Sequence, residues 1–220
     1  GGAGAGMLAM VLVVEEVARV CAATSVILTT QALASDPLLL AGTEDQKKNF
    51  LHRLASGDCL GACGITEPGA GSDVAGMKTT ARKVDGGYVL NGAKIFITNG
   101  GEAQIVTVLA YTDKDKGNRG ISMLILEKGD AGFTVGKHEH KMGMHGSDTR
   151  ELVFEDVFVP ADRLLGPEGG GFRTLMTTFN YTRPAVGGQA LGIAQGALEA
   201  SIRYAKERVQ FGKPLSSFQG

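Results

Sequence analysis

Two hydrophobic periods divide the chain, a helical one at both ends and an alternating one in the middle. Apolar residues follow the helical period over Met7–Leu33 without β-breaking signals, which predicts one long, largely buried helix. Asp36-Pro37 is expected to stop that helix, because the residue before a proline disfavours helical backbone. Thr43–Gln46 matches a capping box, and the helix that it opens is predicted to end at Gly57.

After that helix the pattern alternates between apolar and polar residues, as is typical of short strands. Asp85-Gly86-Gly87 and Asn91-Gly92 lie between such runs, where residues that tolerate positive φ allow a hairpin to close. Several β-prone runs without intervening helices favour a compact antiparallel barrel or sandwich over a βαβ dinucleotide-binding unit. The predicted strands are Thr79–Val84, Tyr88–Leu90, Ala93–Thr98, Ile105–Tyr111, Ile121–Leu126, Phe133–Val135 and Glu151–Phe154.

The helical period returns at Gly171 and is cleanest over Arg183–Arg208. Thr182 is expected to cap this helix, and Pro184 lies in its first turn, where a missing N–H costs little. The helix is predicted to end at Gly212–Pro214. The order of elements is therefore helical, then β, then helical again.

These patterns predict an α+β fold with three parts. We expect N-terminal helices over residues 1–60, a central antiparallel β-barrel or sandwich domain over residues 61–165 and the beginning of a C-terminal helical bundle over residues 166–220. Glycine, at 33 of 220 residues, is about twice as frequent as usual and falls in clusters, which implies many tight turns. The net charge of -1 gives no global field for nucleic acid or an anionic membrane, so an anionic ligand must be held locally.

Neither a membrane span nor a metal site is expected. The apolar run Met7–Val14 meets two glutamates long before the roughly 20 residues that a membrane span requires. The cysteines form a sparse, odd-numbered set that suits a reducing compartment, and two thiols on one strand make no zinc site without further ligands. The histidines fall in a polar loop and are expected to be solvated. The residues weighed for a metal are Cys21, Cys59, Cys63, His138, His140 and His145.

Two polar segments in the β part are candidates for binding a flat, anionic ligand. In Gly64–Asp73, Pro68 fixes one φ while Gly69 and Gly71 permit unusual ones, so that consecutive N–H groups can form an anion-binding nest; a plain surface turn is the alternative. Ile97–Gly101 ends an alternating strand. In that strand Thr98 continues the face of Phe96, which suits a heteroaromatic ring, although an ordinary turn would look the same.

Two further candidate segments lie on the C-terminal helix. Asn180 and Arg183 could hold a polar ligand at the positive end of the predicted helix, although a lone arginine in a first turn is often only solvated. Arg208 could clamp a phosphate and Phe211 could stack on a ring. The alternative is a helix C-terminus whose cations complement the dipole.

These segments, in this order and at these spacings, resemble the acyl-CoA dehydrogenase family. Ile65–Asp73 is very close to the first signature of that family. Lys94–Gly101, Met144–Arg150, Phe154–Pro160 and Arg208–Gln219 also look like family segments, so the resemblance covers nearly the whole chain. It implies an oxidoreductase acting on a CH–CH group of acyl-CoA thioesters in fatty acid metabolism. In that chemistry an α-proton is abstracted, a β-hydride passes to N5 of FAD, and electrons then pass to an electron-transfer flavoprotein.

The resemblance also implies roles for individual residues. Thr66 would bond the pyrimidine edge of the flavin and Thr98 the region of N5, while Phe96 takes the position where many members have Trp. Ser72 would lie near the FAD pyrophosphate and the pantetheine of the substrate. Asn180 and Arg183 would hold the CoA moiety, although an Asp is common where Asn180 stands. The implied FAD-binding residues are Ile65, Thr66, Gly71, Ser72, Phe96, Thr98, Arg208, Phe211 and Gln219, and the implied substrate-binding residues are Ser72, Asn180 and Arg183.

Oligomeric state and the catalytic base follow from the same resemblance. Arg208 and Phe211 match residues that reach the FAD of a neighbouring subunit, which implies a homo-oligomer, a tetramer or a dimer. The base glutamate of the family stands either at the position of Thr182 or well beyond Gly220, so none is expected within the chain, and Glu67 is expected to be structural. The chain alone is therefore expected to be inactive. An acyl-CoA oxidase and a non-catalytic binding or assembly module are the alternatives, and the expected compartment is the cytoplasm, or the mitochondrial matrix in a eukaryote.

Overall fold

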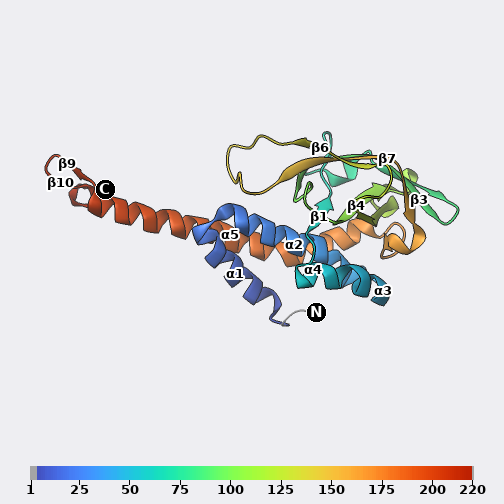
Figure 1. The fold of residues 1–220 in the computed structure, drawn as a ribbon, viewed down its shortest axis with the longest axis horizontal. Helices are drawn as coiled ribbons and strands as arrows, with labels where there is room; N and C mark the ends of the chain where they lie inside the picture. The colour runs from blue at the N-terminus through green and yellow to red at the C-terminus, as the bar shows by residue number, and fades with distance from the viewer. Residues whose placement is uncertain (1–3, 220) are drawn as a thin grey trace.

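In the computed structural model, which describes residues 4–219, a curled β-sheet lies on a layer of helices (Figure 1). The helices are α1 (Gly6–Val20), α2 (Ala22–Ala41), α3 (Glu44–Gln46), a π-helical turn (Lys47–Leu51), α4 (His52–Ser56) and α5 (Gly171–Glu207). Short 3-10 helices cover Val74–Gly76, Lys114–Gly120, Ala161–Arg163 and Leu215–Ser217. The predicted order of helical, β and helical parts is confirmed.

The sheet is mostly antiparallel, as predicted. Its strand order is β6-β7-β3-β2-β4-β5-β8, and β1 pairs with β4 in parallel. A separate hairpin, β9–β10, follows α5. The strands are β1 (Gly61–Gly64), β2 (Thr80–Val84), β3 (Gly87–Thr98), β4 (Ile105–Tyr111), β5 (Ile121–Glu127), β6 (Phe133–His138), β7 (Thr149–Pro160), β8 (Leu164–Leu165), β9 (Val209–Gln210) and β10 (Lys213–Pro214).

Strands β4 and β5 separate two hydrophobic cores. Successive side chains of a strand point to opposite faces, so Val106 and Leu124 fill the inside of the curled sheet while Ile105 and Met123 face the helices. The core on the helical side also receives side chains from α2, the π-helical turn and α5. Both strands are almost wholly buried, which explains why they read as continuous apolar runs.

The N-terminal helical segment differs from the predicted single buried helix. The chain leaves helical backbone at Cys21 (φ −148°, ψ 101°), which separates α1 from α2. Several apolar side chains of α1 are exposed, Leu8 among them. Pro37 does not stop α2, which continues to Ala41, because Pro37 and Leu38 are buried and tertiary packing outweighs one missing hydrogen bond. The capping box at Thr43 and the left-handed residue Gly57 that ends α4 are confirmed.

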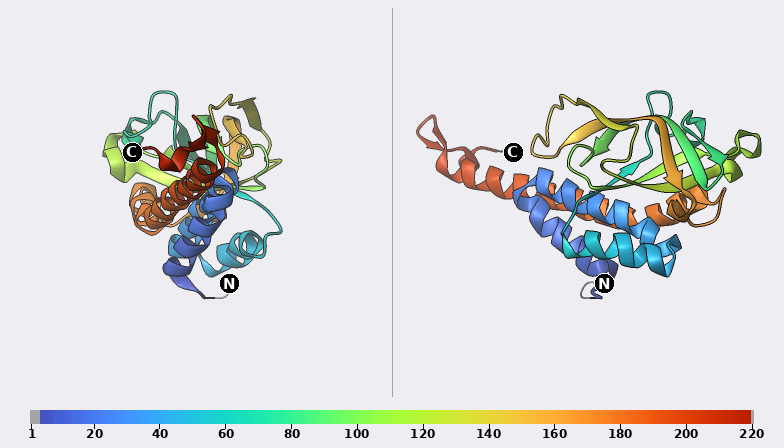
Figure 2. Two further views of the ribbon diagram at one scale, coloured as in Figure 1. Left: turned by 90° about the vertical axis from the view of Figure 1, so that its left-hand side faces the viewer. Right: turned by 45° about the vertical axis from the view of Figure 1, so that its right-hand side comes forward.

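Helices α1 and α5 pack closely because glycines of α5 face α1. A Cβ at Gly188 would meet Val11, and Cβ atoms at Gly192 and Gly196 would clash with backbone of α1. These glycines recur every four residues and therefore lie on one side of the helix. Beyond this contact α5 extends away from the rest of the molecule and ends in the β9–β10 hairpin (Figure 2).

Three predicted boundaries in the β and C-terminal parts are wrong. The C-terminal helix was predicted to end at Gly212–Pro214, but α5 ends at Glu207 and a β9–β10 hairpin follows it. Asn91-Gly92 is no turn, because β3 runs through it with a shift of register against β7, and Gly92 has φ 142°. The hairpin at Asp85-Gly86-Gly87 does form between β2 and β3. Thr182 and Pro184 do not begin a helix, because α5 starts at Gly171 and both residues lie within it.

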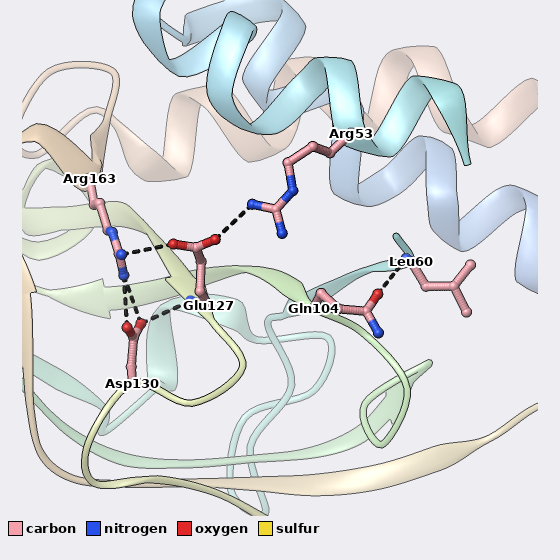
Figure 3. A network of polar contacts seen from close by, with 6 residues as sticks. All are labelled: Arg53, Leu60, Gln104, Glu127, Asp130 and Arg163. Carbon is pink, nitrogen blue, oxygen red and sulfur yellow. Dashed lines mark hydrogen bonds and ion pairs between the residues drawn. The ribbon is translucent and has the colours of Figure 1, made fainter. Parts of the chain in front are cut away.

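Ion pairs join the helices to the sheet (Figure 3). Arg53 of α4 contacts the Glu127 carboxylate at 2.8 Å, and Arg163 contacts the same carboxylate at 2.8 Å. Arg163 also bonds both carboxylate oxygens of Asp130 at 2.9 Å. The end of β5 is thereby fixed to α4 and to the turn before β8. Within residues 4–219, no helix has the length and apolar character that crossing a membrane requires.

Candidate functional site

The loop after β1 lies against the C-terminal half of β3. β1 is fully buried and parallel to β4, so its end delivers Ile65 and Thr66 to this position. The Ile95 N–H donates to the Thr66 carbonyl at 2.9 Å. Ile65 packs partly against the core on the helical side. The structure thus brings Thr66 next to the strand end that carries Thr98, and both residues are partly exposed.

The predicted anion-binding nest in this loop is not formed. Glu67 and Ala70 exchange two backbone hydrogen bonds, of 2.9 and 3.0 Å, around a tight turn. Gly69 and Gly71 do not adopt the left-handed backbone that a nest needs. A Cβ at either glycine would meet no heavy atom within 4 Å. Neither backbone conformation nor packing within the described chain requires glycine there, and the space beside the two residues is open to a ligand.

A β-bulge shapes the end of β3. The register against β7 shifts between Lys94 and Ile97, and Phe96 takes left-handed backbone (φ 58°), which is rare for an aromatic residue. Phe96 is 59% exposed whereas Lys94 is fully buried, so plain alternation fails here. The failure lies between Lys94 and Phe96; the prediction that Phe96 and Thr98 look the same way stays a prediction, and the buried Ile97 between these two more exposed residues agrees with it. The bulge turns the Phe96 ring outward.

The turn after Thr98 is held from two sides. Asn99 (φ 62°) donates from Nδ2 to the Gly61 carbonyl at 3.2 Å, and its own N–H donates to the Asp148 carbonyl at 3.0 Å. The Asp148 carboxylate accepts from the Gly101 N–H at 2.7 Å and from Arg150 Nε at 2.7 Å. Asp148 therefore fixes the position of the turn after Thr98. The sequence did not predict this role, because Asp148 lies 47 positions along the chain from Gly101.

A buried ion pair lies behind the same loop. Lys94 Nζ is 2.8 Å from Glu67 Oε1, and the two side chains are 0% and 6% exposed. Desolvation raises the pKa of Glu67, but hydrogen bonds from Lys94 and Thr79 outweigh it, so the pKa is lowered and the carboxyl stays ionised. A carboxylate held in this way is structural, as the sequence predicted for Glu67. The burial of Lys94 was not foreseen.

A second part of the site is a pocket of about 290 Å³ between α2 and α5. The backbone N–H and C=O groups of the two helices bond within each helix, so side chains determine which ligand the pocket can bind. The Arg183 guanidinium lies 5.5 Å from the centre of the Phe179 ring and reaches Asn180 Oδ1 at 3.5 Å. Among the described residues, none of those lining the pocket is a carboxylate. The lining is Thr29, Thr30, Leu33, Phe179, Thr182, Arg183 and Val186.

The prediction that Asn180 and Arg183 lie at the positive end of a helix is wrong. Both lie inside α5, where backbone N–H groups are already bonded, and not at a positive helix end. Thr182 is no cap, and its buried side chain lines the pocket instead. Of the three predicted substrate-binding residues, Arg183 nevertheless lines a pocket and Asn180 contacts Arg183, which the sequence pattern alone did not show.

Ser72 is exposed on the same loop as Thr66, after Glu67. The remaining predicted residues lie apart from both regions. Arg208 follows the last residue of α5 and Phe211 lies in the β9–β10 hairpin beyond it (Figure 1), with its side chain 95% exposed. Gln219 is also exposed at that end. Within residues 4–219, no group of three His, Cys, Asp or Glu side chains could hold a metal ion.

Three family models match the chain in sequence order. The N-terminal domain of acyl-CoA dehydrogenases matches residues 1–58, the middle domain residues 62–157 and the C-terminal domain residues 169–220. Together the matches cover nearly all of the chain and follow its division into helices, sheet and a long final helix.

Relatives of known name and structure agree with these matches. A short-chain specific acyl-CoA dehydrogenase of Megasphaera elsdenii is 53% identical over 98% of this chain and 57% of its own length. The structure of butyryl-CoA dehydrogenase from that organism superposes with a TM-score of 0.96 at 52% identity, covering all of this chain and 58% of the other. Two further structures each match all of this chain and 58% of their own chain. One is a chain in a structure of the electron transferring flavoprotein of Acidaminococcus fermentans, with a TM-score of 0.97 and 50% sequence identity. The other is PigA with FAD and proline, with a TM-score of 0.94 and 34% sequence identity. The chain spans little more than half the length of these proteins, and it belongs to the acyl-CoA dehydrogenase family.

Proposed function

We propose that the protein uses FAD to oxidise acyl-CoA thioesters to their α,β-unsaturated products, as an enzyme of fatty acid metabolism. The observation that carries the proposal is the hydrogen bond from Ile95 to Thr66, because it joins the two predicted flavin-binding segments. Relatives named for acyl-CoA substrates support it. Since the chain covers 57% of such a relative, the activity is proposed for the whole protein.

The residues around Thr66 fit a flat cofactor with an anionic tail. Gly69 and Gly71 leave open space that the chain itself does not use, and the bulge holds the Phe96 ring toward solvent. Thr66 and Thr98 would bond the flavin ring, with Ile65 beside it, and Gly71 and Ser72 would lie near the pyrophosphate. FAD, when bound, supplies the acceptor for hydride. A structural neighbour solved with FAD supports this assignment.

The pocket between α2 and α5 would receive the thioester. Phe179 and Leu33 offer apolar surface for an acyl chain, while Arg183 offers a cation for the CoA portion, next to Asn180. The reaction needs a carboxylate to take the α-proton. Thr182 cannot act as that base, and Glu67 is bonded to Lys94 and two backbone N–H groups. We therefore assign the base to a residue outside 4–219.

The exposed far end of α5 supports assembly with a second copy. Arg208 ends α5 and Phe211 lies in the β9–β10 hairpin, and this end of the chain stands away from the sheet (Figure 2). Their exposure leaves them, together with Gln219, free to contact the FAD of a neighbouring subunit. We propose a dimer or tetramer in the cytoplasm, or in the mitochondrial matrix of a eukaryote. An electron-transfer flavoprotein is the proposed electron acceptor, which the Acidaminococcus neighbour supports.

The decisive test uses a hybrid protein in which this chain replaces the matched region of the Megasphaera elsdenii relative. We expect the purified hybrid to retain FAD, and butyryl-CoA to bleach its visible flavin band under anaerobic conditions. Crotonyl-CoA, which is already unsaturated, must not bleach it. An FAD-loaded hybrid that no saturated acyl-CoA bleaches would refute the dehydrogenase proposal. Fast re-oxidation by air after bleaching would instead indicate the acyl-CoA oxidase alternative.

The proposed role of Phe211 has its own test in the same hybrid. Because its ring is 95% exposed, Phe211→Ala should leave the urea unfolding midpoint of the apoprotein unchanged. Loss of one base-stacking contact, worth about 1–3 kcal/mol for aromatic–base stacking, should weaken FAD binding roughly 5- to 100-fold. Val209→Ala, which shortens another exposed apolar side chain of the same hairpin, is the control. Equal FAD affinity of all three proteins would contradict the role.

A further inference from the structure

Lys94 is a fully buried cation in the middle of β3. Its Nζ donates to the Ile65 carbonyl at 3.1 Å and to Glu67 Oε1 at 2.8 Å, and it lies 4.0 Å from Met77 Sδ. Burying a charge is costly unless it is paired and hydrogen-bonded. Both of its oxygen partners belong to the loop that carries Thr66.

The partner carboxylate connects a third segment. Glu67 Oε2 accepts from the Lys78 N–H at 2.6 Å, and Oε1 accepts from the Thr79 N–H at 3.1 Å. These two residues lead into β2. The ion pair therefore joins three segments of the chain: the loop after β1, the entry to β2 and the middle of β3.

The position of the pair next to the bulge gives it a specific consequence. Lys94 is the last residue in regular register before the shift, and Ile95, which follows it, donates its N–H to the Thr66 carbonyl. Phe96 then takes left-handed backbone, a strained state that persists only where the surroundings impose it. The Phe96 ring is 59% exposed, so its own packing does not impose that state.

The bonds that the pair makes to backbone suit it to fixing geometry. Replacing a buried ion pair with uncharged groups of similar volume is often neutral or stabilising, whereas leaving one charge without its partner is strongly destabilising. This pair bonds the Ile65 carbonyl before Thr66 and the Lys78 and Thr79 N–H groups after it, so it holds the segment that carries Thr66 from both sides.

We propose that the Lys94–Glu67 pair is a positioning element that sets the placement of Thr66 relative to Phe96 and Thr98, and thereby shapes the flavin site. The inference rests on the proposed FAD-dependent function and deepens it. Neither residue touches the cofactor in this account. They act through the Ile65 carbonyl, the Ile95–Thr66 hydrogen bond and the bulge.

The test compares two double variants of the hybrid protein. Lys94→Met with Glu67→Gln removes both buried charges and keeps one amide oxygen as an acceptor where Glu67 offers two, one for each of the Lys78 and Thr79 N–H groups. Lys83→Met with Glu168→Gln makes the same chemical change in a solvent-exposed pair whose atoms are 2.7 Å apart. The readouts are the urea unfolding midpoint of each apoprotein, the FAD dissociation constant from fluorescence titration, and the position and fine structure of the bound flavin's visible band.

We expect the Lys94/Glu67 double variant to unfold cooperatively near the parent midpoint, to bind FAD at least 10-fold more weakly and to show a shifted flavin band. The Lys83/Glu168 variant should match the parent in the last two properties. Parent-like affinity and spectrum in the Lys94/Glu67 variant would overturn the positioning role, as would a loss of apoprotein stability that accounts for the weaker binding. If the unmodified hybrid fails to bind FAD, the proposed function falls, and the positioning role falls with it.

Discussion

Asp36 carries an unfavourable charge that one substitution can remove. It lies on α2 directly before Pro37, and desolvation by burial raises the pKa of its carboxyl to about 6. Within the described residues, its carboxylate has no ion pair or hydrogen bond to offset that cost. We predict that Asp36→Asn stabilises the chain at neutral pH.

The size and the sign of the effect follow from the two protonation states. An aspartate in the unfolded chain titrates near pH 3.9, so the folded value is about 2 units higher, which corresponds to at most about 3 kcal/mol. Partial exposure reduces this to roughly 1–2 kcal/mol. Between about pH 4 and 6 the folded state binds more protons at this site than the unfolded state, so Asp36 lowers stability as pH rises. Below about pH 4 both states are protonated and the cost disappears.

Urea unfolding of the purified chain at pH 4.0 and pH 7.5, followed by circular dichroism, measures this difference. Asp36→Asn should be more stable than the parent by about 1–2 kcal/mol at pH 7.5 and nearly equal to it at pH 4.0. Asp85→Asn, on the exposed turn between β2 and β3, is the control and should show no such pH-dependent gain. An Asp36→Asn gain that is equal at both pH values, or absent at pH 7.5, would refute the reasoning.

Three further predictions concern packing, ion pairs and thiols. In the same urea assay, Gly192→Ala should lower the unfolding free energy by about 1–3 kcal/mol, because the new Cβ would clash with α1. Gly187→Ala faces open space on the same helix and should raise the unfolding free energy by about 0.5–1 kcal/mol. Arg163→Met should cost about 1–2 kcal/mol, with a smaller loss at 1 M salt, because it leaves Asp130 without its ion-pair partner and Glu127 paired with Arg53 alone (Figure 3). Equal losses at both ionic strengths would contradict an ionic origin. In native protein titrated with a thiol reagent at pH 8, only Cys21 should react quickly. Cys21 is exposed and a hydrogen bond from Thr24 lowers its pKa, whereas Cys59 and Cys63 are buried and burial raises their pKa values.

The central strands were predictable because their signals are local. β4 was predicted at its observed bounds, Ile105–Tyr111, since an apolar run bounded by polar residues leaves little choice of conformation. The hairpin at Asp85-Gly86-Gly87 and the capping box at Thr43 were equally local. Each rests on a few neighbouring residues whose backbone preference agrees with the tertiary structure.

Helix boundaries failed where packing outweighed local preference. Pro37 and Pro184 each read as a helix end or start, yet α2 and α5 run through them. Both helices bury residues next to the proline, Leu38 in one and Ala185 in the other. Continuing a helix that buries such side chains compensates for the single hydrogen bond that a proline removes.

The candidate site was only partly predictable. Residue types and the family resemblance pointed to Thr66 and Thr98, but the alternating pattern gave no sign of the bulge between Lys94 and Ile97. Lysine is among the residues that are least often fully buried, so nothing in the pattern marked Lys94 as buried. Its burial could be anticipated only by pairing it with Glu67, and no sequence period links residues 27 positions apart.

The proposed flavin region and the proposed thioester pocket pack against the same hydrophobic core. Ile65, beside the proposed flavin, and Phe179, in the proposed thioester pocket, both pack against the core on the helical side of the sheet. The helix that carries Phe179 begins at Gly171, where a side chain would clash with the backbone of β5. Hydride transfer requires donor and acceptor atoms to be held within about 3–3.5 Å. That spacing therefore depends on the packing of α5 against β5 as well as on side chains at the site, and a volume change in this core should alter turnover before it alters binding.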